Sequence, residues 1–181
     1  MGQSFSALEA KHTDFIARQR IFFIASAAAG TRVNVSPKPA DALRVIDANT
    51  MVYLDLTGSG NETAAHVFAN GPVTFMFCAF AGPPLILRLF GKGRVLRRDG
   101  AAYAALLDSA FGGYQPPGAR QIVRLNIDLV RTSCGFGVPL FEYVGDRDTL
   151  ARWAASKGEA GLREYRRAKN SESLDGFPTG F

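Results

Sequence analysis

The sequence predicts an antiparallel β-barrel with helices packed on its outer side, a fold of the mainly β (α+β) class. Strand-like apolar runs dominate and mostly form hairpins, with helical patterns inserted between them. This order lacks the regular alternation of strand and helix that a parallel doubly wound sheet requires. Hydrophobic residues make up 47% of the 181 residues, enough for one substantial core. No repeat or linker divides the chain, so we expect one domain over residues 1–181, with its core at about 9–145.

Apolar periodicity and turn residues define the elements of the first half of the chain. Phe15 and Ile16 lie on the inner face of an amphipathic helix, and a buried strand follows. A tight turn leads into a second strand, which we expect Pro37 and Pro39 to stop. Asn61 is placed to act as the N-cap of the helix after the third strand. In order, the patterns predict a helix at 9–20, strands at 21–28 and 32–36, an ambiguous stretch at 40–49 that could hold a helical turn, a strand at 51–56 and a helix at 62–70.

The second half contains two long strands and further helices. Gly91 and Gly93 alternate within one long strand and indicate a bend or bulge at a barrel corner. A basic run that includes Arg166 is typical of the solvated face of a helix. Residues 171–181 are polar and contain Gly and Pro, so we expect a tail that is loose or docked on a partner. In order, the patterns predict strands at 73–80 and 85–96, a helix at 101–111, a strand at 121–132 and, within 146–170, helices at 149–157 and 159–169.

The net charge and the composition of the chain argue against several classes of function. The net charge of +5 fits ordinary solubility or, as the functional alternative, an anionic small ligand. Aromatic residues do not interleave with basic ones, so we expect no nucleic-acid partner. We also expect no membrane association, because no apolar window spans a bilayer and no signal peptide opens the chain. Cys78 and Cys134 form neither a close pair nor a metal-type pair, so we expect a reducing, cytoplasmic environment and no metal site.

The most informative segment is residues 53–66, where an apolar strand ends in a turn of small residues that opens a helix. Such a junction offers free backbone N–H groups, hydroxyls and the positive end of a helix dipole, which together suit a phosphate. A dinucleotide fingerprint is excluded, because Thr63 replaces its third glycine and the next strand ends without an acid. A plain strand-to-helix turn is the alternative, and taken alone it is the better one.

Arg32 and Lys38 flank the second strand at an even spacing. On a regular strand both side chains would point to one face, although Pro37 interrupts the regularity. An arginine fork and a mobile lysine charge could bind phosphate oxygens. The alternative is that both are exposed cations at the ends of a strand, which is common for Arg and Lys.

The segment around Cys134 carries no catalytic signature. A nucleophilic cysteine would need a nearby histidine, and His12 and His66 both lie far from it in the sequence. A tight loop that lets the backbone approach a ligand or a partner is the better interpretation. A serine hydrolase is also excluded, since residues 57–60 do not read Gly-x-Ser-x-Gly.

Four short segments are more informative together than singly: residues 22–27, 32–38, 53–61 and 89–95. In order and spacing they resemble the pyridoxamine 5′-phosphate oxidase-related family, over roughly residues 9–145. Residues 132–139 and 165–170 are similar to a subgroup of that family. The resemblance implies a split antiparallel Greek-key β-barrel with flanking helices, which binds flavin mononucleotide (FMN) at a homodimer interface.

Carried over by position, the resemblance implies cofactor contacts on the second strand, in the turn after the third strand and, more weakly, in the loop at 134–137. Better-known members place basic residues in that turn, where this chain has Gly60 and Asn61. The charge that binds the phosphate must then come from Arg32, Lys38 or the partner subunit. The implied cofactor-binding residues are Arg32, Asn34, Val35, Ser36, Lys38, Thr57, Ser59, Asn61, Cys134 and Gly135.

The resemblance implies an FMN-binding oxidoreductase with a small-molecule redox substrate, in which the flavin supplies the redox chemistry. Residues 174–181 lack the Arg-Leu-His-x-Arg-type signature of the true oxidase, so pyridoxamine phosphate is not the expected substrate. Two alternatives stay open. One is a non-catalytic protein that binds or sequesters flavin, deazaflavin or haem, and the other is a dimeric scaffold with a vestigial pocket.

Overall fold

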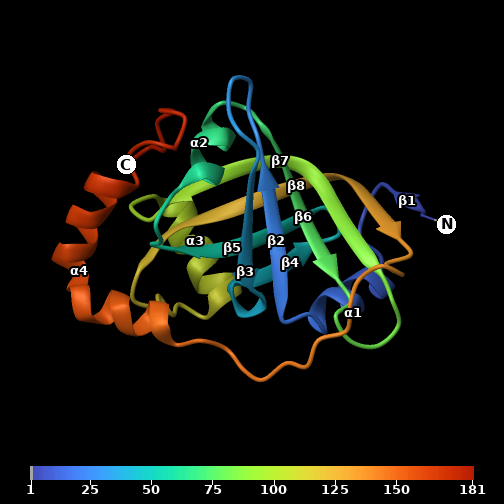
Figure 1. Cartoon of the computed structure of the whole chain (residues 1–181). Coiled ribbons are helices and arrows are strands. Elements are labelled where there is room, and N and C mark those ends of the chain that lie inside the picture. Colours follow the sequence, from blue (N-terminus) through green and yellow to red (C-terminus); the bar gives the residue numbers. More distant parts are fainter. Residues whose placement is uncertain (1) are drawn as a thin grey trace.

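The chain folds into a single curled antiparallel sheet surrounded by helices (Figure 1). The computed structural model describes residues 2–181. The strands are β1 (Ser4–Phe5), β2 (Ile21–Ser26), β3 (Asn34–Pro39), β4 (Leu43–Asp47), β5 (Thr50–Leu56), β6 (Pro72–Cys78), β7 (Ile86–Arg97) and β8 (Ala119–Ser133). The helices are α1 (Ala10–Ala17), the 3₁₀ helix η1 (Ala40–Ala42), α2 (Glu62–Phe68), α3 (Ala101–Phe111) and α4 (Thr149–Lys169).

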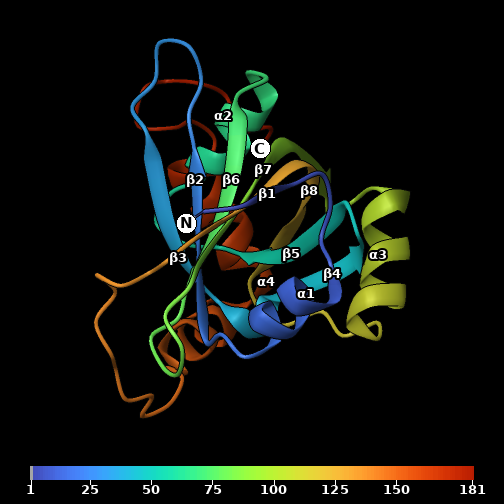
Figure 2. The same ribbon diagram turned by 90° about the vertical axis from the view of Figure 1, so that its right-hand side faces the viewer.

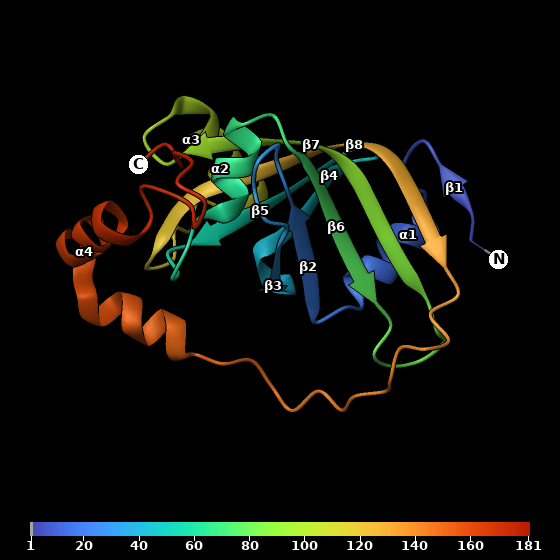
Figure 3. The same cartoon turned by 45° about the horizontal axis from the view of Figure 1, so that its top comes forward.

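The sheet is an open barrel whose two edge strands are β3 and β4. Its strands follow the order β3-β2-β6-β7-β8-β5-β4, with β1 paired to β8 outside this path, and the paired strands are antiparallel. The two edge strands are consecutive in the chain and are joined only by η1. Figure 3 shows the curl of the sheet. The predicted antiparallel barrel with flanking helices is therefore confirmed.

The longest ladder joins β7 to β8, and its irregularity lies at a glycine. The register shifts between Phe90 and Gly91. A Cβ atom at Gly91 would lie only 1.9 Å from the carbonyl oxygen of Asn126, so no larger residue fits there without movement. The pairing advances by one residue on β7 and by two on β8, so the extra residue of the bulge is Asp128 on β8. The irregularity that the sequence predicted at these glycines is confirmed, but the bulged strand is the partner of the one that carries them. At Gly93 a Cβ atom would lie 2.5 Å from Cγ2 of Val67, so this glycine lets α2 approach the sheet closely.

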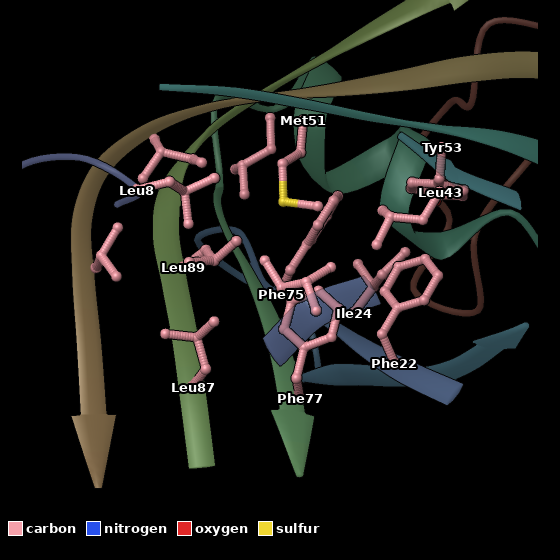
Figure 4. Close-up of a cluster of buried hydrophobic side chains, with 14 of the residues drawn as sticks. Leu8, Phe22, Ile24, Leu43, Met51, Tyr53, Phe75, Phe77, Leu87 and Leu89 are labelled. Carbon is pink, nitrogen blue, oxygen red and sulfur yellow. The ribbon is translucent and has the colours of Figure 1, made fainter. Parts of the chain in front are cut away.

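The inner side of the sheet holds the main hydrophobic core (Figure 4). The rings of Phe22 and Phe77 stack with their centroids 5.8 Å apart, and Tyr53 meets Phe75 edge to face at the same centroid distance of 5.8 Å. Complete burial of each large apolar side chain contributes about 1.5–3 kcal/mol. A smaller core lies where Val52 of β5 packs toward α3. Because β5 is buried on both faces, its sequence is almost continuously apolar.

Pro37 does not stop the second predicted strand, so the expectation is wrong for this residue, whereas β3 does end at Pro39. Pro37 pairs with Phe23, and Pro39, the last residue of β3, pairs with Ile21. β3 is an edge strand with β2 as its single neighbour, so proline there need not remove a ladder hydrogen bond. Pro37 and Pro39 are two residues apart, so the backbone positions at which other residues would carry an N–H group face the same side of β3. The ambiguous stretch at 40–49 contains the short η1 and then β4.

The C-terminal part packs against the barrel more closely than the sequence suggested. α4 is interrupted at Gly158 (φ 62°, ψ 172°), so the prediction of two successive helices is confirmed. Arg166 is buried, so the prediction of a fully solvated basic face is wrong at this residue. The tail after α4 docks on its own chain, since Asp175 pairs with Arg32 and the Leu174 N–H donates to Glu62 (Figures 1 and 2).

Three features of the structure relate to the expectations about membranes, cysteines and metal sites. Within residues 2–181, no helix combines the length and the apolar character that crossing a bilayer would need. Cys78 is buried, Cys134 is exposed, and neither forms a disulfide. No group of three or more potential metal ligands occurs among these described residues.

Candidate cofactor site

A cavity of about 840 Å³ opens between β3, the turn from β5 to α2, and the start of α4. Small-molecule sites commonly measure about 300–1,000 Å³, so its size suits a cofactor. Tyr53, Phe111 and Leu150 are among the apolar residues that line it. Burial raises the pKa of the Tyr53 phenol well above its ordinary value, so this side chain lines the cavity as a neutral group.

Residues of β3 form one wall of the cavity. Asn34, Ser36 and the run Pro37 to Pro39 line it, whereas Val35 points the other way and is 58% exposed. Over residues 34–36 this is the alternation that a regular strand imposes. Ser36 Oγ donates to Asn34 Oδ1 at 3.3 Å, and Asn34 Nδ2 in turn donates to Thr63 Oγ1 at 3.4 Å. The polar side of this edge strand is thus already ordered by hydrogen bonds.

Asp55, at the end of β5, places a negative charge at the centre of a buried polar cluster. Its carboxylate accepts hydrogen bonds from Lys38 Nζ at 2.9 Å, Arg120 Nε at 2.8 Å and Gln121 Nε2 at 2.8 Å. Burial by itself would raise the pKa of Asp55, but the neighbouring Arg120 and Lys38 charges outweigh burial and hold it well below its ordinary value. Two cations therefore share one carboxylate.

The turn after β5 is held by hydrogen bonds, one of which comes from Gln121 of the same cluster. Gln121 Nε2 donates to Asn61 Oδ1 at 2.8 Å, and Thr57 Oγ1 donates to the Gly118 carbonyl at 2.8 Å. Asn61 occupies the N-cap position of α2 as predicted, but its side chain makes no capping hydrogen bond. Its Nδ2 is buried and has no hydrogen-bond partner among the residues described. A donor left over at the wall of a cavity is available to a ligand oxygen.

The C-terminal helix reaches under this turn and supports it. Arg166 Nε donates to Thr57 Oγ1 at 2.8 Å, and Asn170 Nδ2 donates to the Gly58 carbonyl at 3.1 Å. Asn170 Oδ1 also accepts a hydrogen bond from Arg120 at 2.8 Å, which ties α4 to the Asp55 cluster. The geometry of the turn therefore depends on residues more than 100 positions away in the chain.

The predicted site residues fall into two groups in the structure. Arg32 lies before β3 with a side chain that is 74% exposed and paired with Asp175, outside the cavity lining. Cys134 and Gly135 follow β8 at the far end of that strand and do not line the cavity. The cavity brings together Asn34, Ser36, Lys38, Ser59 and Asn61, whereas Arg32, Val35, Thr57, Cys134 and Gly135 lie outside its lining.

Several residues of the site were not predicted from the sequence. Asp55 offered a signal, because a carboxylate inside the apolar strand Thr50–Leu56 requires a buried partner. Arg120 lies at the start of β8 and Asn170 directly follows α4, so nothing in their local sequence points toward the turn. Their roles follow from long-range packing.

Comparison with known proteins agrees with this architecture. A sequence model of the pyridoxamine 5′-phosphate oxidase family matches residues 8–134. The pyridoxamine 5′-phosphate oxidase family protein ustO of Aspergillus flavus is 38% identical over 183 aligned residues, which cover 91% of this chain and 72% of that protein.

Two solved structures share the fold at low sequence identity. HupZ from Group A Streptococcus superposes with a TM-score of 0.55 at 20% identity, covering 69% of this chain and 98% of that chain. A pyridoxamine 5′-phosphate oxidase candidate from Lactobacillus delbrueckii gives a TM-score of 0.55 at 19% identity, covering 70% and 94%. At these identities the likeness concerns the fold alone.

Proposed function

This chain belongs to the pyridoxamine 5′-phosphate oxidase family, and on that premise we propose that it binds FMN in the cavity beside β3 and acts as an oxidoreductase on a small molecule. The observation that carries the proposal is the buried, unpartnered Nδ2 of Asn61 at the wall of a cofactor-sized cavity. Lys38 and Arg120, two cations that share the single carboxylate of Asp55, support an anionic group of the ligand beside them.

The residues of the cavity fit the chemical groups of FMN. Lys38, Ser59 and Asn61 would hold the phosphate, because a cation, a hydroxyl and an amide N–H all donate to phosphate oxygens. Asn34 and Ser36 would hydrogen-bond the remainder of the cofactor. When bound, the flavin supplies the hydride or electron chemistry, and the protein binds and orients it.

The lining favours a flavin over haem among the cofactors considered. Haem iron is held by His, Cys, Met or Tyr side chains. Among the described residues, the cavity lining includes no His, Cys or Met, and its tyrosines are Tyr53 and Tyr114. The Tyr53 phenol has a raised pKa, which opposes the phenolate form that ligates iron. A deazaflavin has the same overall shape as a flavin, so spectroscopy must separate these two.

A homodimer is part of the proposal. Large apolar side chains are exposed on the segment after β8, where Phe136 is 81%, Leu140 73% and Val144 95% exposed. Exposed apolar groups gathered on one segment are typical of an interaction surface. Contacts from Arg32, Cys134 or Gly135 to a cofactor would then come from the second copy. Light scattering at micromolar concentration should give twice the chain mass, and a monomer mass would contradict this part.

The cofactor proposal is tested by titrating FMN into the apoprotein and following the quenching of flavin fluorescence. Lys38→Gln should weaken FMN binding by about 10- to 100-fold, because a hydrogen bond to a charged group contributes roughly 1.5–3 kcal/mol and a tenfold change is about 1.4 kcal/mol. Lys92→Gln is the matched control, since Lys92 is exposed on β7 and does not line the cavity. Equal FMN affinity in the two variants would remove the proposed phosphate contact.

Catalysis is tested separately from binding. The FMN-loaded protein is mixed with NADH or NADPH and an electron acceptor, and steady-state reduction is followed. Turnover supports the oxidoreductase, whereas tight FMN binding without turnover with any donor favours a non-catalytic flavin-binding protein.

A further inference from the structure

The residues that follow α4, 171–181, form a closed and ordered loop, which we call the C-terminal loop. A β-bridge pairs Glu172 with Pro178. Inside this bridge the N–H of Ser173 donates to the Phe177 carbonyl at 2.8 Å, and Ser173 itself is buried. Figures 1 and 3 show the loop beside α2. The end of the described chain is thus a folded part of the molecule.

The C-terminal loop holds both ends of the turn that would bind the phosphate. Asn170, directly before the loop, donates from Nδ2 to the Gly58 carbonyl at 3.1 Å. Four residues later, the N–H of Leu174 donates to both carboxylate oxygens of Glu62, at 3.1 and 3.2 Å. The turn over residues 58–62 therefore lies between two contacts from one short segment.

Two further contacts fix the loop on the barrel. The backbone N–H of Arg32 donates to Asp175 Oδ2 at 2.7 Å, and the side chains of these two residues form an ion pair. At the end of the loop, the Arg97 guanidinium donates to the Gly180 carbonyl. Because the loop is held before and after Leu174, the position of that residue is set by the fold.

Leu174 and Glu62 both line the cofactor cavity, as do Ser59 and Asn61 of the same turn. Leu174 is 77% exposed, so it lies where the cavity opens to solvent. We propose that Glu62 and Leu174 close the phosphate end of the cavity, so that the site accepts a flavin ending in one phosphate and excludes a dinucleotide such as FAD. This selectivity rests on the proposed function, since FMN and FAD share the flavin that the cavity would hold.

Glu62 supplies the electrostatic part of the exclusion. Among the described residues it has no ion-pair partner, and its carboxylate accepts hydrogen bonds from the Leu174 N–H. The phosphate of FMN would lie between Lys38, Ser59 and Asn61. A second phosphate placed beyond it would approach the Glu62 carboxylate, and like charges at short range repel.

Leu174 supplies the steric part. The adenosine of a dinucleotide would have to leave the cavity past this side chain, which the loop contacts hold in place. A flavin mononucleotide ends before that point, so the same side chain would not obstruct it. Glu172 is an exposed carboxylate on the same loop and does not line the cavity, so it provides a matched control.

The test compares FMN and FAD, each titrated calorimetrically into the full chain. The wild type should bind FMN at least 100-fold more tightly than FAD. Glu62→Gln keeps an oxygen that accepts from the Leu174 N–H and removes the charge, and it should reduce this ratio at least 10-fold. Leu174→Ala should also reduce it at least 10-fold, whereas Glu172→Gln should change it less than 2-fold. Urea midpoints of the same samples show whether each variant is folded.

Equal affinity of the wild type for FMN and FAD would overturn the selectivity and leave the proposed function standing. The selectivity is also overturned if folded Glu62→Gln and Leu174→Ala retain the wild-type ratio, as Glu172→Gln should. Binding of neither flavin, or of FAD alone, would remove the proposed function together with the selectivity.

Discussion

Lys38 Nζ lies 2.9 Å from Asp55 Oδ1, and this ion pair connects two strands that are not neighbours in the sheet. Lys38 is on β3, at one edge, and Asp55 is on β5, next to the opposite edge strand β4. The contact therefore crosses the opening of the barrel. Arg120 of β8 binds the other oxygen of the same carboxylate at 2.8 Å. The cluster that closes the barrel also forms the wall of the cofactor cavity.

Asp55→Asn should strongly destabilise the fold. The substitution leaves Lys38 and the buried Arg120 without their counter-charge, and breaking a buried pair in this way costs about 3–5 kcal/mol. The free energy of unfolding is measured by urea denaturation. Asp128→Asn is the control, because Asp128 is exposed on β8. A loss of less than about 1 kcal/mol for Asp55→Asn would contradict the role assigned to the cluster.

The same carboxylate predicts an acid-sensitive stability. Because the folded-state pKa of Asp55 lies below its ordinary value of 3.8, its contribution is complete above that value and is lost as the pH falls through it toward the folded pKa. Wild-type stability should therefore decline below about pH 4, measured as the urea midpoint across pH. Asp55→Asn should show a shallower decline. Parallel pH profiles for the two proteins would show that Asp55 is not the group concerned.

Asn170→Ala should weaken FMN binding without unfolding the barrel. Asn170 bridges Arg120 and the Gly58 carbonyl, so its loss frees the turn that would hold the phosphate. We expect FMN affinity to fall about 10-fold, corresponding to roughly 1.4 kcal/mol. Lys169→Ala, one position earlier and exposed, should leave affinity unchanged. If both variants bind FMN like the wild type, the turn does not depend on α4.

Gly91→Ala should destabilise the β7–β8 ladder. The new Cβ would meet the Asn126 carbonyl carbon and oxygen within 2.9 Å and 1.9 Å, and backbone on both sides must shift. Overpacking of this kind costs about 1–3 kcal/mol or more, measured as the loss in the free energy of unfolding. Gly137→Ala is the control, because a Cβ there would meet nothing within 4 Å. Equal stability of the two variants would show that the bulge tolerates a side chain.

The sequence predicts what local patterns determine. The helix at 101–111 was predicted with the bounds that the structure shows, because alanine and leucine periodicity and the glycines at 112 and 113 define it. An irregularity at Gly91 was also predicted, since glycines at alternate positions weaken a regular strand and favour a bend there, and the structure has the bulge on β8 opposite this glycine. The resemblance to a known family supplied the split barrel, and the comparisons support that family.

Long-range packing determined what the sequence did not reveal. Prolines inside β3 are tolerated because that strand lies at the edge, which depends on the topology of the whole sheet. Arg166 belongs to a run that is typical of a solvated helix face, yet it is buried because the turn at Thr57 supplies its hydrogen-bond acceptor. Arg32 and Lys38 were treated as equivalent cations, but Lys38 reaches Asp55 whereas Arg32 pairs with Asp175 of the tail.

The measurement that tests the central claim most directly is the absorption spectrum of the purified chain after incubation with FMN and removal of free ligand by gel filtration. We predict a flavin spectrum that co-elutes with the protein at one FMN per chain. Elution of FMN apart from the protein, or a haem spectrum in the protein as isolated, would contradict the account.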